Sequence, residues 1–126
     1  MQLNGIQLGT EDSKKLGNFY TKVFGKPGWN QDDDKNGAWF GWVIAGGALM
    51  VGPHSEVKGQ NQEPARIMIN LIDKDVKATL KKFEEAGAEI IAKPYQPDSK
   101  NSPEVWLATA ADPDGNYIQI STPWEE

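Results

Sequence analysis

Three amide side chains stand in segments whose flanking residues are apolar. They are Gln7, Asn70 and Gln119, and each has an isoleucine or leucine on both sides. A buried amide must find hydrogen-bond partners, and a dry core accepts an apolar side chain at a lower free-energy cost. The three amides could therefore bind a small ligand, or they could satisfy one another and the neighbouring backbone. The sequence leaves both interpretations open.

Acid–base chemistry has one candidate pair. His54 is the only histidine, and it stands two residues before Glu56 in a loop flanked by glycine and proline. Such a pair could be a catalytic general acid and base near neutral pH, or it could be an exposed loop pair without chemistry. Arg66 could bind an anionic group of a ligand, or it could pair with Glu63.

Aromatic walls for a ligand could come from the tryptophans, of which the chain has five. Trp42 and Trp106 are the preferred candidates for ligand binding, because both fall in predicted central strands. Packing in the core or at an interface is the alternative for each of them. The remaining tryptophans are Trp29, Trp39 and Trp124.

Composition limits the class of protein. The chain has 126 residues, a net charge of −5 and a pI near 4.9, so nucleic acid is not expected as a partner. The absence of cysteine excludes disulfides, thiolate zinc sites and cysteine nucleophiles. No apolar run approaches the roughly 20 residues of a membrane span, and no signal pattern opens the chain. We therefore expect a single domain in the cytoplasm, without a membrane partner.

Hydrophobic periodicity predicts the elements that position these residues. In the first half it predicts a strand at 3–8, a helix that Gly25 ends in the αL conformation, a polar loop-like segment up to residue 37, and strands at 38–45 and 48–51. In the second half it predicts a strand at 66–72, a helix that Gly87 ends, and strands at 88–92, 104–110 and 117–121. The second half is thus βαβββ, and the first half fits the same order if its polar segment contains a strand.

The two halves also align residue by residue. Residues 6–12 match residues 69–75, with an apolar strand followed by an acidic helix cap in both. A duplicated module explains this register better than chance. We expect modules at about 1–52 and 65–124, joined by a loop at 53–64. In this alignment Gln7 and Asn70 occupy equivalent places.

Two motifs carry a resemblance to a known family. The helix end Phe-Tyr-Thr-Lys-Val-Phe-Gly at 19–25 and the strand entry Ala-Asp-Pro-Asp-Gly-Asn at 111–116, at this separation, resemble the vicinal oxygen chelate superfamily. That superfamily includes glyoxalase I, bleomycin-resistance proteins, extradiol dioxygenases and fosfomycin-resistance enzymes. The resemblance implies an α+β fold in which two βαβββ modules curve a mixed sheet around a cup. It also implies a homodimer and, in the enzymes, a divalent metal in the cup.

The family's metal ligands come from the first and last strands of each module, and they are usually histidine or glutamate. By the resemblance, these positions fall on Gly5, Met68, Met50 or Val51, and Gln119. None of these residues offers the imidazole or carboxylate that a divalent ion needs. We therefore expect no metal and no other cofactor.

The sequence favours a glyoxalase or bleomycin-resistance-like protein that binds a small organic molecule in its cup without a metal. Gln7, Asn70 and Gln119 would orient the ligand, and Met68, Trp42, Trp106 and Arg66 would complete the site. Two alternatives remain: a metal-dependent lyase or dioxygenase with ligands relocated to His54 and Glu56, and an interaction or regulatory module with a vestigial cup. If the protein is an enzyme, the resemblance implies a glyoxalase-like lyase or isomerase.

Overall fold

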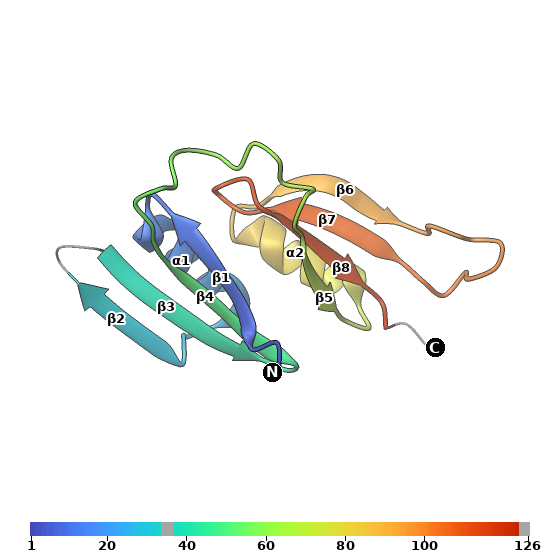
Figure 1. Cartoon of the computed structure of the whole chain (residues 1–126). Helices are drawn as coiled ribbons and strands as arrows, with labels where there is room; N and C mark the ends of the chain where they lie inside the picture. The colour runs from blue at the N-terminus through green and yellow to red at the C-terminus, as the bar shows by residue number, and fades with distance from the viewer. Residues whose placement is uncertain (34–36, 124–126) are drawn as a thin grey trace. The chain divides into compact units, whose positions relative to one another are not determined.

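The computed structural model describes residues 1–33 and 37–123, with the side chain of residue 33 left aside. Its chain forms two compact units that divide after Gly59, inside the expected linking loop at 53–64. Each unit is a four-stranded mixed sheet with one helix (Figure 1). The elements are β1 (Gly5–Thr10), α1 (Ser13–Phe24), β2 (Trp29–Asp33), β3 (Gly37–Ile44), β4 (Gly47–Pro53), β5 (Ile69–Ile72), α2 (Val76–Glu85), β6 (Glu89–Tyr95), β7 (Leu107–Ala111) and β8 (Tyr117–Ser121).

The two units have the same topology, which confirms the predicted α+β fold of two βαβββ modules. The first sheet has the order β1-β4-β3-β2, and the second has the order β5-β8-β7-β6. In each sheet the first strand runs parallel to the fourth, and the other pairings are antiparallel. A parallel pair needs a crossover, which the helix and the intervening hairpin supply in both units.

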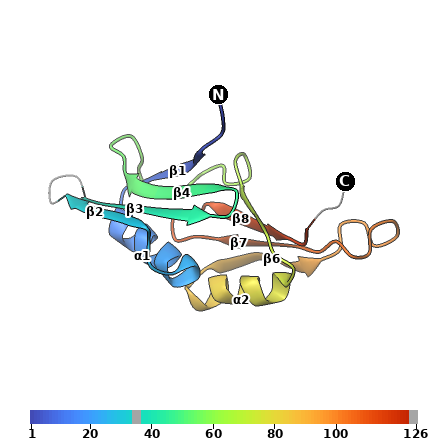
Figure 2. The same ribbon diagram turned by 90° about the horizontal axis from the view of Figure 1, so that it is seen from below.

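The helix of each unit covers one face of its own sheet (Figure 2). In β3 the alternate residues Ala38, Phe40 and Trp42 are buried, and β3 contacts α1. In β8 the alternate residues Ile118 and Ile120 are fully buried beneath α2. Because strand side chains alternate between faces, the residues between them lie on the opposite face of each sheet. We call this the open face of the unit.

Both helices begin at the predicted acidic caps. Asp12 accepts a hydrogen bond from the Lys15 backbone N–H at 3.1 Å, and Asp75 accepts one from Ala78 at 3.0 Å. Each bond satisfies a backbone donor that the helix itself leaves without a partner. Gly25 has the positive φ that favours glycine, at 89°, but its ψ of −169° is extended, so the predicted αL cap is wrong there.

Several strand predictions need correction, and one of them is the strand predicted at 88–92, which extends to Tyr95 in β6. Residues 29–33, predicted as a loop, form the edge strand β2, which pairs with β3 on one side only. An edge strand can be polar because it buries little side-chain area, so periodicity does not reveal it. β5 begins at Ile69 rather than Arg66, and β7 begins at Leu107 rather than Glu104.

Candidate functional site

The predicted amides occupy equivalent positions in the two units. Gln7 in β1 lies opposite Met50 in β4, and Asn70 in β5 lies opposite Gln119 in β8. Gln119 in turn lies opposite Thr109 in β7. All of these residues alternate with the buried residues beneath the helices, so they lie on the open faces. In the second unit they form a row of uncharged hydrogen-bonding side chains across three strands, in which Asn70 is exposed and Thr109 is buried.

The side chains of the three amides do not hydrogen-bond to the rest of the described chain. Gln7 and Asn70 are exposed and Gln119 is half-buried. Within residues 1–33 and 37–123, none of their side chains hydrogen-bonds another protein group. The interpretation that the amides only satisfy one another is therefore wrong for the described part of the chain. Gln7 and Met50 also line a shallow hollow of about 210 Å³ in the first unit.

The family's metal-ligand positions do not fit a divalent ion. A Cβ added at Gly5 would collide with the backbone carbonyl oxygen of Ala48, the partner of Gly5 in β4. At the second position the open-face residue is Met50, because Val51 is fully buried on the helix side. With Met68 and Gln119 the donor set is two thioethers and one amide, which a hard or borderline cation does not favour. Across the described ranges, no cluster of three His, Asp or Glu side chains could hold a metal.

Trp42 lies on the opposite side of its sheet from the amides. Its side chain is 4% exposed, and its indole stacks on Phe40 with ring centroids 6.0 Å apart. Its Nε1–H donates a hydrogen bond of 2.9 Å to the carbonyl oxygen of Gly25, just beyond α1. These contacts place Trp42 in the core between β3 and α1, which excludes it as a ligand wall on the open face.

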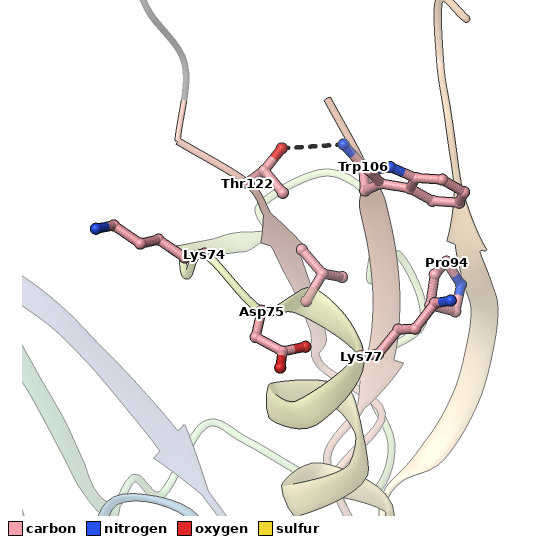
Figure 3. A pocket seen from close by; sticks show the side chains of 7 residues that line it. Lys74, Asp75, Lys77, Pro94, Trp106 and Thr122 are labelled. Atoms are coloured by element: carbon pink, nitrogen blue, oxygen red, sulfur yellow. Dashed lines mark hydrogen bonds between the residues drawn. The ribbon is translucent and has the colours of Figure 1, made fainter. Parts of the chain in front are cut away.

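Trp106 lies just before β7, on the α2 side of the second sheet. It lines a hollow of about 240 Å³ with Lys77, Pro94 and Thr122 among its neighbours (Figure 3). The Lys77 Nζ lies 5.7 Å from the centroid of the Trp106 ring, within the range of a cation–π contact. The Trp106 backbone N–H donates to Thr122 Oγ1 at 3.0 Å. The structure therefore does not bring Trp106 together with Asn70 and Gln119, which lie on the other face.

His54 and Glu56 lie close together after β4, but their geometry does not suit a general base. The Glu56 backbone N–H donates to His54 Nδ1 at 3.1 Å, so the proton of the neutral imidazole is on Nε2. The 3.9 Å between Nε2 and Glu56 Oε2 is too long for a hydrogen bond. In this tautomer the Nδ1 lone pair already accepts a hydrogen bond, and Nε2–H is a donor.

Arg66 is an exposed turn residue paired with Glu63. Its Nε and one terminal nitrogen meet the two carboxylate oxygens at 2.9 and 3.2 Å. Of the two roles predicted for Arg66, the structure shows the pairing with Glu63.

A family model described as a glyoxalase-like domain matches residues 5–121. The chain belongs to this glyoxalase-like family, within the vicinal oxygen chelate superfamily. A comparison with curated proteins gives no significant match.

Solved structures share the fold of this glyoxalase-like chain at low sequence identity. A glyoxalase-related enzyme from Fulvimarina pelagi is 18% identical with a TM-score of 0.74, covering 98% of this chain and 88% of that one. A glyoxalase / bleomycin resistance protein from Catenulispora acidiphila is 22% identical with a TM-score of 0.67, covering 98% and 100%. TnmS3, an antibiotic binding protein from Streptomyces sp. CB03234, is 22% identical with a TM-score of 0.67, covering 98% and 97%.

Sequence reasoning missed the aromatic residues on the open face of the first unit of this glyoxalase-like protein. Trp39 in β3 and Trp29 in β2 both lie there, and Trp29 is 46% exposed. The six-membered ring of Trp39 covers Gly52 in β4. The sequence does show that Trp39 alternates with the residues that are buried in β3. Only the position of α1, however, shows which face of the sheet is open. Trp124 lies outside the described residues.

In the described part of the chain, neither α1 nor α2 is long and apolar enough to cross a bilayer.

Proposed function

We propose that the protein binds a small, neutral, partly aromatic organic molecule on its open faces, without a divalent metal. The observation that carries the proposal is the pairing of Asn70 with Gln119 on adjacent strands, with both amides free to hydrogen-bond a ligand. Amide groups donate and accept without a charge, so they suit a neutral ligand. The name of TnmS3 as an antibiotic binding protein supports a binding role for this fold.

The metal-free part of the proposal is supported by Gly5. The backbone at this position leaves no room for a ligating side chain, and the remaining family positions offer no carboxylate or imidazole. We infer sequestration rather than turnover, because the Nδ1 lone pair of His54, the only histidine, already accepts a hydrogen bond from the backbone. The absence of cysteine fits a cytoplasmic location. The family resemblance also leads us to propose a homodimer. Light scattering, which gives the mass of the protein in solution, tests this oligomeric state.

Nuclear magnetic resonance tests the amide site with two small, neutral aromatic probes, 2-naphthol and 2-naphthamide. We expect at least one probe to shift the side-chain NH₂ signals of Asn70 and Gln119. Gln119→Ala and Asn70→Ala should each weaken its binding by about 5- to 10-fold, since each removes about one net hydrogen bond. Asn18→Ala, at an exposed amide on α1, is the matched control and should bind as the wild type does. Unchanged affinity in both site variants would refute the amide site.

Metal analysis tests the metal-free part. The purified protein should contain no stoichiometric divalent ion, and EDTA should not change its thermal stability. One ion per chain that is lost in His54→Ala and Glu56→Ala would overturn this part and support the relocated site.

A further inference from the structure

The first unit contains a second hollow, which is larger than the one beside Gln7. It has a volume of about 440 Å³ and lies at the end of β1 and β4. This volume is within the range of small-molecule sites, which is about 300–1,000 Å³. We call it the Trp39 hollow, and its lining residues are Thr10, Glu11, Trp39, Pro53, His54, Ser55 and Lys58.

One side of the Trp39 hollow is an indole fixed by a glycine. A Cβ at Gly52 would collide with the six-membered ring of Trp39, so only glycine allows the ring to lie on the β4 backbone. The ring thus has one face on the sheet and is half-buried. An indole held flat in this way presents a planar apolar surface, on which another aromatic ring can stack.

The other side of the hollow is a turn that holds His54 in one orientation. The His54 backbone N–H donates to the carbonyl oxygen of Thr10 at 3.1 Å, and its carbonyl accepts from Val57 at 3.1 Å. The Cβ of His54 lies only 3.0 Å from the place of a Cβ on Gly9, so the missing side chain of Gly9 lets the turn approach β1. Because Nδ1 accepts from the Glu56 backbone, the imidazole offers Nε2–H as a donor at the edge of the hollow, 3.9 Å from Glu56 Oε2.

The opposite charges among the residues that line the hollow cancel, and the nearby Glu56 carboxylate disfavours an anionic ligand. Lys58 Nζ lies 3.5 Å from Glu11 Oε2, so the cation and the anion that line the hollow pair with each other. An indole face, a neutral imidazole donor and a paired lysine together favour a neutral ligand with a hydrogen-bond acceptor.

We infer that the Trp39 hollow binds a planar aromatic ring that carries a carbonyl acceptor, with the ring on Trp39 and the carbonyl oxygen on His54 Nε2–H. The inference rests on the proposed function in one respect only: it takes from it the class of ligand, a neutral and partly aromatic molecule. Its residues are separate from Asn70 and Gln119, so either site can fail while the other stands.

In the test, 2-naphthamide is added to the full chain, and binding is measured by the indole N–H signals in the NMR spectrum. We expect the Trp39 signal to shift, and Gly52→Ala, which displaces the ring, to weaken binding at least about fivefold. Gly41→Ala is the matched control, because its Cβ would lie an ordinary 3.5 Å from the nearest atom, in Trp29. An unshifted Trp39 signal, or equal affinity in Gly52→Ala and the wild type, would overturn the inference.

His54 gives a second test that does not depend on packing at Gly52, because the side chain is exposed. His54→Leu should weaken 2-naphthamide binding about threefold or more and leave naphthalene binding unchanged, since naphthalene has no acceptor. His54→Gln, which keeps an N–H donor, should retain part of the difference. Equal loss of both probes in His54→Leu would contradict the proposed hydrogen bond, and failure of 2-naphthamide to bind the wild type would refute the site.

Discussion

Gly17 in α1 lies against the ring of Phe40 in β3, so close that a Cβ added to Gly17 would fall among the ring atoms. This contact sets the distance between the helix and the first sheet. It also fixes which face of the sheet is covered, because Phe40 and its partner Val51 must point toward α1. Met50, Gln7 and Trp39 therefore lie on the other face.

Gly17→Ala should destabilise the protein by about 1–3 kcal/mol, because the added methyl group overpacks the contact with Phe40. If the contact with Phe40 were absent, Gly17→Ala should stabilise the protein, because alanine has a higher helix propensity than glycine. Urea unfolding measures the change. Gly28→Ala is the control, since a Cβ there would have no atom closer than 4.0 Å, and its unfolding midpoint should change little.

Asp112→Ala should cost about 2–3 kcal/mol of stability, because the buried carboxylate organises the turn between β7 and β8. It accepts hydrogen bonds from the backbone N–H groups of Asp114 and Asn116 at 2.9 and 3.0 Å, and from the Asn116 side chain at 2.9 Å. Asp112→Asn keeps one acceptor oxygen and should lose less. Equal losses in the two variants, measured by urea unfolding, would contradict this role of the carboxylate.

Asp73 predicts a pH dependence. Hydrogen bonds from the Asp75 backbone N–H and the Thr79 hydroxyl lower the pKa of this exposed carboxyl below its ordinary value. A group with a lowered folded-state pKa stabilises the fold above its unfolded pKa, and this contribution is lost as pH falls through the folded pKa. Asp73→Ala should therefore be less stable than the wild type at pH 7, and the difference should shrink below about pH 4. A difference that stays constant over this range would exclude linkage to Asp73.

A histidine at Gly5, the residue type that the family uses as a ligand, should destabilise the first unit. Gly5→His should lower stability by about 1–3 kcal/mol in urea unfolding, through collision with Ala48. Gly47→Ala is the control in the neighbouring strand, where a Cβ would lie 3.7 Å from the nearest atom. If Gly5→His were as stable as Gly47→Ala, β1 would have to move away from Ala48 easily, and the prediction would fail.

The order of elements could be predicted from the sequence because local signals set it. Asp-Pro-Asp-Gly fixes the start of β8, which spans Tyr117–Ser121 as predicted, and the acidic caps fix the start of both helices. The edge strand β2 could not be predicted, because its polar residues are held by backbone pairing with β3 alone.

The candidate site could be predicted only in part. Alternation places Gln7 and Asn70 on one face of each strand, but the sequence does not say which face the helix covers. For Trp42 and Trp39, three residues apart in β3, that choice separates a core residue from an open-face residue. It depends on the contact between Gly17 and Phe40, which joins residues far apart in the chain.

The close approach of Gly5 to the Ala48 carbonyl also has an evolutionary consequence. A side chain that binds a metal can normally be gained by one substitution, because the backbone leaves a place for it. Here the backbone itself occupies that place, so any single substitution at Gly5 that could ligate a metal would also weaken the fold. The strand would have to shift before selection could favour a ligand, so a metal site at this position would be hard to acquire.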